Sequence, residues 1–274
     1  MKINNVVAYL DDRFHPEYQE DYDNAGFLLG DSSAEYNGAL VALDLTAAVI
    51  EEARTLGLNL IVTHHPFIFS GLKRLTDRSE AGRMAIDMIR SGISTYAAHT
   101  NLDNLPDGVN GILSERLGLH NCCILRPCGE LSPSYSPLNG QSIGHSVAIG
   151  AGMIGNLDTA LDSDIFLARV KQQLGLPVVR HNGVHRSVQR IAICGGSGAE
   201  FIGDALQSGA DAFLTADLKY HDFQRPEGRM LLADIGHFES EQFACEIISR
   251  VISEKFCNFA CRISQCQKSI VSYI

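Results

Sequence analysis

The chain has 274 residues, of which 45% are hydrophobic and 20% are charged, and its formal net charge is −10 at pH 7. This acidic balance argues against nonspecific nucleic-acid binding, which depends on lysine and arginine to neutralise phosphates. No run of 18 apolar residues could span a membrane, and residues 1–5 lack the pattern of a signal peptide. We therefore expect a cytoplasmic protein with reduced cysteines, no membrane partner and no strong nucleic-acid binding.

Strand-like apolar segments alternate with helix-like segments along the chain, which is the pattern of an α/β protein. In the first half, we expect strands and helices in alternation at 38–45, 47–56, 58–63, 80–91 and 93–99. In the second half, we expect strands at 189–194, 211–215 and 230–235, and helices at 199–208 and 241–256.

A repeated order of elements indicates that these halves are similar. Residues 51–65 predict a helix, Leu-Gly, an apolar strand and Thr-His-His, and residues 203–217 predict a helix, Ser-Gly, an apolar strand and Thr-Ala-Asp. We therefore predict two similar α/β lobes with mixed sheets, at 1–125 and 126–274, facing a metal-bearing cleft.

The middle of the chain differs from the rest in composition. Residues 125–138 hold several prolines and serines, so this segment is the best candidate for a linker or surface loop. Residues 142–150 are expected to form the strand that begins the second lobe.

The first candidate site lies at His64 and His65, which end the apolar run 60–63 and precede Pro66. Because strand side chains alternate between faces, neighbouring histidines can share a site only where the strand has ended, and Pro66 marks such a place. Neutral imidazole suits zinc, iron, nickel and copper, so the pair indicates a divalent-metal site. The alternative is two surface histidines that merely cap a strand.

Two later strand-like segments end in similar side chains. His99 and Asp103 follow the segment 93–98, and His237 follows the segment 230–235. In open α/β sheets, ligands bind outside the carboxyl ends of the strands, so these residues join the candidate set.

The acids after His237 have separate expected roles. We expect Ser240 to be the N-cap of the last long helix, with Glu241 at the first helical position and directed into the loop region. Glu239 is interpreted as an ordinary first-turn acid favoured by the helix dipole.

The candidate ligands are imidazoles and carboxylates without a cysteine, namely His64, His65, His99, Asp103, His237 and Glu241. This mixture favours a hydrolytic or redox metal site over a closed structural zinc site. Five or six ligands are too many for one tetrahedral ion. They suit two ions, with a carboxylate such as Glu241 bridging them at roughly 3.5–4 Å.

Two weaker patterns stay open at this point. The loop at 194–198, which contains Gly195 to Gly198, could cradle a phosphate at a helix N-terminus, or it could be a tight turn that needs positive φ. Asp217 and His221 stand four residues apart and could face the metal site, or they could be an ordinary pair on a helix surface.

The motifs along the chain resemble those of the NIF-three-like dinuclear-metal family, whose members are often labelled GTP cyclohydrolase I type 2 homologues. The resemblance covers almost the whole chain. The matching segments are at 23–30, 42–46, 63–69, 72–73, 98–103, 108–110, 194–198, 215–219 and 236–241.

The resemblance implies a ligand set and an assembly. The family's metal ligands fall on His64, His65, Asp103, His237 and Glu241, which hold two divalent ions per subunit with the glutamate bridging. The resemblance also implies a toroidal homohexamer. Zinc, iron and manganese all fit the ligands.

Other matching positions have less defined roles or differ from the family. His99 lies in a matching motif and is a candidate catalytic residue; the alternatives are that it supports a metal ligand or faces the substrate. Ala25 and Ala216 depart from the family's usual residues without removing a ligand, and the stretch between Arg126 and Phe166 is too short for the domain that many relatives insert there.

These observations predict a metal-dependent hydrolase, in which a metal-activated water attacks a nucleotide-like or heterocyclic small molecule. His99 or Asp217 would carry the proton. The alternative is a non-catalytic hexameric metal-binding scaffold or regulatory protein, and a redox metal centre is a third possibility because histidine and carboxylate also hold iron.

Overall fold

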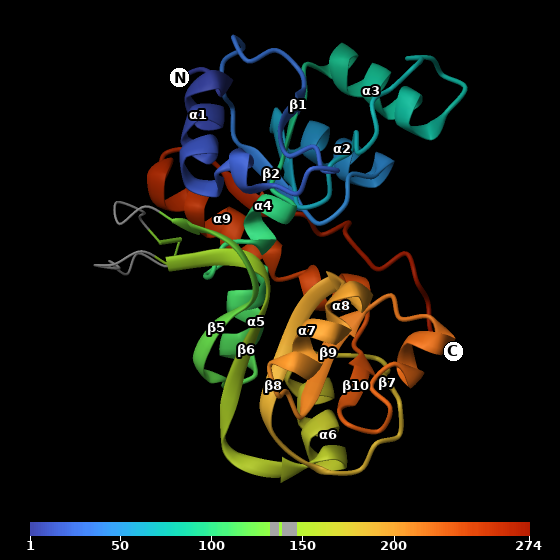
Figure 1. Cartoon of the computed structure of the whole chain (residues 1–274). Helices are drawn as coiled ribbons and strands as arrows, with labels where there is room; N and C mark the ends of the chain where they lie inside the picture. Colours follow the sequence, from blue (N-terminus) through green and yellow to red (C-terminus); the bar gives the residue numbers. More distant parts are fainter. Residues whose placement is uncertain (132–136, 139–146) are drawn as a thin grey trace. The chain divides into compact units, whose positions relative to one another are not determined.

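The structure is a computed structural model that describes residues 1–131, 137–138 and 147–274 (Figure 1). It divides into two compact units. The first combines Met1–Leu102 with Ala244–Lys268, and the second combines Asp103–Phe243 with Ser269–Ile274. Within the described residues, no helix is both long and apolar enough to cross a membrane.

The first unit is built on a five-stranded sheet in the order β1-β4-β3-β2-β11. Strands β2, β3, β4 and β11 are parallel to one another, whereas β1 is antiparallel to β4. The strands are β1 (Gly26–Leu29), β2 (Ala39–Ala42), β3 (Leu60–Thr63), β4 (Ser94–Ala97) and β11 (Cys261–Ile263). Because β2 and β3 are buried along their whole length, their apolar runs lack the alternation of a half-exposed strand.

Helices with well-defined ends cover this sheet. They are α1 (Ile3–Phe14), η1 (Pro16–Tyr18), α2 (Ala47–Thr55), α3 (Glu80–Ser91), α4 (Thr100–Asp103) and α9 (Ala244–Lys255). Helix α3 matches its predicted range, because Ser79 caps its first turn and Gly92, at φ 66°, ends it in the left-handed conformation. Val49, Ile50 and Ala53 of α2 and Met88 of α3 pack in one core with apolar residues of β2 and β3.

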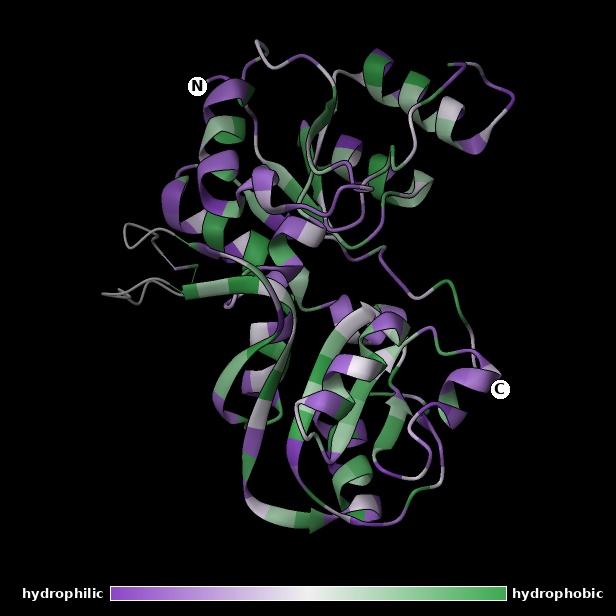
Figure 2. Ribbon diagram, viewed as in Figure 1, coloured by the Kyte–Doolittle hydropathy of each residue, from purple (hydrophilic) through white to green (hydrophobic). Residues whose placement is uncertain are grey.

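The second unit is built on a six-stranded sheet in the order β5-β6-β8-β9-β10-β7. Strands β8, β9 and β10 are parallel, and the other pairings are antiparallel. The strands are β5 (His120–Leu131), β6 (Val147–Asp162), β7 (Arg180–His181), β8 (Ser187–Ser197), β9 (Ala212–Ala216) and β10 (Leu231–Asp234). The apolar residues of β9 appear green in Figure 2, and Phe213 and Leu232 lie in the core of this unit.

Short helices complete the second unit. They are α5 (Val109–Arg116), α6 (Ser163–Gln173), η2 (Ala199–Phe201), α7 (Ile202–Gln207), η3 (Tyr220–Gln224) and α8 (His237–Glu241). The predicted fold class, an α/β protein with two mixed sheets, is confirmed.

Several predicted boundaries differ from the structure. The units do not follow the expected ranges 1–125 and 126–274, because β11 pairs with β2 and brings the C-terminal segment into the first unit. The proposed linker at 125–138 is strand as far as Leu131, where β5 ends. Its remainder falls largely outside the described residues, as does the first part of the strand expected at 142–150.

The helix expected at 241–256 is two helices, α8 and α9. Gly236, with φ 84°, precedes α8, so the helix begins at His237 and Ser240 is not its N-cap. The Ser240 hydroxyl instead donates to the His237 carbonyl and accepts the amide of Gly196. Glu241 therefore ends α8, whereas the prediction placed it at the start of a helix.

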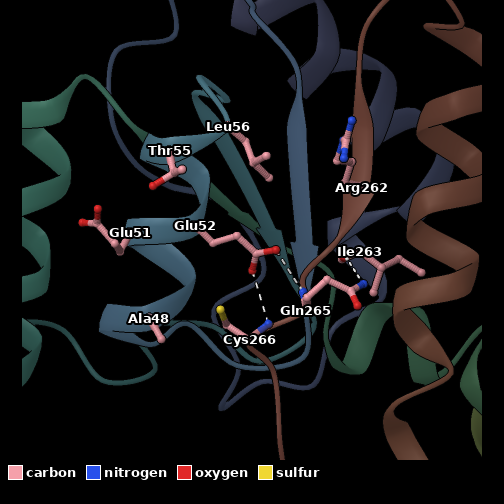
Figure 3. A pocket seen from close by; sticks show the side chains of 9 residues that line it. All are labelled: Ala48, Glu51, Glu52, Thr55, Leu56, Arg262, Ile263, Gln265 and Cys266. Carbon is pink, nitrogen blue, oxygen red and sulfur yellow. Dashed lines mark hydrogen bonds between the residues drawn. The ribbon is translucent and has the colours of Figure 1, made fainter.

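A hollow of about 860 Å³ lies on the first unit between α2 and the segment 262–266 (Figure 3). The Glu52 carboxylate accepts hydrogen bonds there from the amides of Gln265 and Cys266, at 3.0 and 3.3 Å, and from the Ser264 hydroxyl. Although burial raises the pKa of Glu52, these hydrogen bonds outweigh it, so the pKa is lowered. This carboxylate thus anchors the C-terminal segment to α2, and none of the lining residues is a predicted ligand.

Candidate metal-ligand sets

The first unit brings three histidines together beyond the carboxyl ends of β3 and β4. His64 and His65 directly follow β3, and His99 follows β4, its parallel neighbour. The ring centroids lie 5.1 Å apart for His64–His65, 5.3 Å for His64–His99 and 5.4 Å for His65–His99. One ring nitrogen from each lies within 4.8 Å of the others, so the three can hold a metal ion.

The two adjacent histidines can approach each other because the strand ends at Thr63. The Thr63 hydroxyl donates to the His65 carbonyl at 2.7 Å, which closes a turn of the backbone. The prediction that His64 and His65 follow the end of a strand is confirmed.

Hydrogen bonds at Nδ1 fix the orientation of both imidazole rings of this pair. The Nδ1 of His64 lies 2.7 Å from the Ala98 carbonyl oxygen, which can only accept, so Nδ1 carries the proton. The Nδ1 of His65 lies 2.7 Å from Oδ1 of Asp44. Fixing Nδ1 as the donor leaves the lone pair on Nε2, which is the usual arrangement of a metal-binding histidine.

His99 is held in the same way by Asp23. Its Nδ1 lies 2.8 Å from Oδ1 of Asp23, whose side chain is fully buried. Burial raises the pKa of Asp23, but hydrogen bonds from His99 and Thr100 outweigh this effect and lower the pKa to about 2. The Asp23 carboxylate is therefore ionised at neutral pH and keeps the proton of His99 on Nδ1.

The second unit places His237 between two carboxylates. The Nδ1 of His237 lies 2.8 Å from Oδ2 of Asp217, and its Nε2 lies 2.9 Å from Oε2 of Glu241. His237 and Glu241 are four residues apart, one turn of α8, so they share a helix face.

The electrostatics of this set favour a positive charge. Burial lowers the pKa of His237, but hydrogen bonds and Coulombic attraction from Glu241 and Asp217 outweigh it and raise the pKa to about 9. The charge can be a proton on the imidazole or a cation bound at Nε2. The pair of His237 and Glu241 therefore offers an imidazole and a carboxylate, both of which are metal-ligand groups, in surroundings that favour positive charge.

The position of the Glu241 side chain requires a glycine at residue 196, because any Cβ there would collide with the carboxyl group. Its carboxyl group is buried and lies against Gly196, where an added Cβ would be 2.0 Å from Oε1. Gly196 also has φ 62°, a conformation that glycine adopts without strain.

The glycine loop is a tight turn that leaves room for Glu241. The amide of Gly195 donates to Oδ1 of Asn110 at 2.9 Å, and that of Gly196 donates to the Ser240 hydroxyl at 3.0 Å. The positive φ predicted for this turn is confirmed at Gly196, and phosphate binding by the loop stays a prediction.

Asp103 lies at the end of α4 and belongs to the second unit. Burial raises the pKa of the Cys194 thiol, and the charges of Asp103 and then Glu241 raise it further. One carboxylate oxygen of Asp103 lies within 4.8 Å of one of Glu241, so the two acids are neighbours in the second unit.

The remaining candidates have different surroundings from those expected. Asp217 does not pair with His221 but binds His237, and His221 is exposed on η3 beside Gln224, 3.5 Å away. Glu239 lies in the first turn of α8 as expected, although it is buried. Asp44, Asp23 and Asp217 orient three histidines, a role that was not predicted for any of them.

The fold and these donor sets define a two-unit α/β protein with histidine–carboxylate metal-ligand sets. The family model Duf34/NIF3 (NGG1p interacting factor 3) matches residues 1–269, so the chain belongs to this family. The resemblance stated from the sequence is thereby confirmed.

Proteins named GTP cyclohydrolase 1 type 2 homolog are similar over nearly the whole chain. The one from Clostridium perfringens is 32% identical over 259 residues, which cover 93% of this chain and 92% of the relative. That from Nostoc sp. is 33% identical over 251 residues, covering 90% and 89%. Neither name states a substrate for this chain.

Solved structures share the fold. Staphylococcus aureus protein SA1388 has a TM-score of 0.87 and 30% identity, covering 100% of this chain and 99% of that one. Reduced HcgD from Methanocaldococcus jannaschii has a TM-score of 0.77 and 21% identity, covering 96% and 97%, which shows the likeness of the fold alone.

Proposed function

We propose that this chain is a metal-dependent hydrolase that holds two divalent ions through His64, His65, Asp103, His237 and Glu241, with Glu241 bridging. The proposal is supported by one hydrogen-bonding arrangement, which is found at His64, His65, His99 and His237. Each has its Nδ1 bound to a carbonyl or carboxylate oxygen, which leaves Nε2 as the metal or proton acceptor.

The donor chemistry supports two ions rather than one. The first unit contributes imidazoles, and the second contributes His237 with the carboxylates of Asp103 and Glu241. Imidazole with carboxylate is a ligand mixture of hydrolytic and redox ions, and a shared carboxylate bridges two ions at roughly 3.5–4 Å. Zinc, iron and manganese remain the candidate metals.

The bound ions would lower the pKa of a coordinated water to about 7 and polarise the bond it attacks. Residues of the chain itself would then accept the proton released in the reaction. The ionised Asp23 holds the Nδ1 proton of His99, so Nε2 of His99 can accept a proton from the reacting groups. The name of the relatives favours a nucleotide-like or heterocyclic small molecule as substrate.

The test is metal analysis of protein purified without added metal, followed by a turnover screen of nucleotides and pterins with that metal restored. We expect His99→Ala to lower turnover while it leaves most of the bound metal in place, whereas His64→Ala should reduce both. Activity of the intact protein should rise with pH through a midpoint near 7.

The outcomes separate the hydrolase from its alternative. A protein that binds two ions but turns over nothing in the panel would be a metal-binding scaffold. Turnover that persists in the double variant His64→Ala, His237→Ala would show that the chemistry lies elsewhere, and the proposed mechanism would be dropped.

A further inference from the structure

Asp234 is a buried carboxylate behind the pair formed by Asp217 and His237. It ends β10, and its side chain is 7% exposed. Its Oδ2 accepts the amide of Leu218 at 3.0 Å, and its Oδ1 accepts the amide of Gly236 at 3.1 Å. Leu218 directly follows Asp217, and Gly236 directly precedes His237, so one carboxylate binds the backbone of both loops.

Arg180 completes this arrangement from the neighbouring strand. Arg180 on β7 is the cross-strand partner of Asp234, and its guanidinium forms an ion pair with Oδ2 of Asp234. The same guanidinium donates to the Leu218 carbonyl at 3.0 Å. Both the amide and the carbonyl of Leu218 are therefore held.

The backbone at Asp217 needs such support. Asp217 has φ 57°, in the left-handed region that is unfavourable for residues with a Cβ. A loop held by fewer hydrogen bonds would relax from this conformation and move the Asp217 carboxylate away from Nδ1 of His237.

We infer that Asp234 is a positioning residue for the metal ligand His237: it fixes the Asp217 and His237 loops so that Asp217 can orient the imidazole. This inference rests on the proposed metal site but concerns residues that do not bind the ions. Hydrogen-bond partners that orient a metal-binding histidine typically change metal affinity by 10–100-fold when lost.

A matched control lies at the other end of β9. Asp211 accepts the amides of Gln189 and Arg190, at 3.0 and 2.9 Å, and pairs with Arg186 at 3.1 Å. It therefore makes the same kinds of interaction as Asp234, two backbone amides and one arginine, but it precedes β9 whereas Asp217 follows it. A purely structural role would make the two carboxylates equivalent.

The experiment compares Asp234→Asn, Asp211→Asn and the unchanged full-length protein. Zn²⁺ alone is titrated into each apoprotein against a competing chelator, and the thermal midpoint of each apoprotein is recorded. We expect both variants to lose thermal stability, but only Asp234→Asn to bind Zn²⁺ at least tenfold more weakly. Faster hydrogen exchange at the Leu218 and Gly236 amides should accompany the loss.

Each outcome decides the inference. Unchanged Zn²⁺ affinity in folded Asp234→Asn, or an equal loss in Asp211→Asn, would overturn it and leave the proposed metal site intact. Should Asp234→Asn not fold, Arg180→Gln carries the test, because it keeps the Asp234 carboxylate and removes the contact to the Leu218 carbonyl. A several-fold weaker affinity would support the inference, and an unchanged one would overturn it. A wild-type protein that binds none of Zn²⁺, Fe²⁺ and Mn²⁺ would remove the proposed metal site itself.

Discussion

Glu241 is the residue on which the proposed pair of ions depends most. As a bridging ligand it contacts both ions, so Glu241→Ala is expected to lose both together, whereas Asp103→Ala should lose mainly one. Elemental analysis after dialysis measures the difference, and Glu239→Ala, an acid of the same helix, should retain full metal content. Two ions per chain in the Glu241→Ala protein would remove the bridging role.

Gly196 provides a second test of the position of Glu241. The Cβ of Gly196→Ala would lie 2.0 Å from Oε1 of Glu241, and the backbone has φ 62°. We expect the carboxylate to be displaced and metal affinity to fall about tenfold or more.

The control for this substitution is Gly203→Ala. Gly203 lies in α7, where an added Cβ meets no atom within 4 Å. Alanine should stabilise this helix by about 0.5–1 kcal/mol and leave metal binding unchanged. Equal metal affinity in both alanine variants, measured by chelator competition, would contradict the close approach of Glu241 to Gly196.

The sequence was sufficient to find the histidines but not the groups that orient them. His64, His65 and His99 follow apolar runs, and a strand end is visible in such a pattern. Asp23 lies before β1, and β1 is antiparallel to β4, so the start of β1 meets the end of β4 where His99 lies. The direction in which two strands pair is a property of the tertiary structure, and the pattern of apolar residues along the chain does not indicate it.

At the scale of elements, Glu52 of α2 controls how firmly the segment 264–266 is held. Its pKa is lowered in the folded protein, so the stabilisation is present above the unfolded pKa of about 4.3 and is lost as the pH falls through the lower folded value. Glu52→Gln removes this charge and is expected to cost about 1 kcal/mol at pH 7.

Thermal unfolding across pH measures this effect. A loss of about 1 kcal/mol corresponds to roughly 2–4 °C in Tm, and the difference from wild type should shrink toward pH 3. Glu51→Gln, the neighbouring acid in the same hollow, should show a smaller difference at pH 7, because Glu51 forms an exposed ion pair with Arg54. A difference for Glu52→Gln that is independent of pH would contradict its charged role.

Predicted elements were most accurate where local signals were strong. Helix α3 has a serine cap and a terminal glycine, and both are visible in the sequence. The break between α8 and α9 was missed, as was the hydrogen bond to Ser240 from Gly196, a residue 44 positions away. β11 was also missed, since its three residues carry too little periodicity to identify a strand.

At the scale of the whole molecule, we propose a homohexamer, as the family resemblance implies. Large apolar side chains remain exposed on the single chain, among them Ile89 at 55%, Ile165 at 61% and Tyr220 at 77%. Sedimentation should give about six times the chain mass of 29.8 kDa. A chelator should not change this mass, because all the proposed ligands of one site belong to the same chain. A stable monomer at micromolar concentration would refute the hexamer.

The return of the C-terminal segment to the first sheet has a consequence for synthesis on the ribosome. β2 lies between β3 and β11, and β11 begins at Cys261. During translation, one edge of β2 (Ala39–Ala42) therefore stays unpaired until more than two hundred further residues have been synthesised. Such an edge can pair with other chains, so the nascent polypeptide is exposed to aggregation until residues 261–263 have been synthesised.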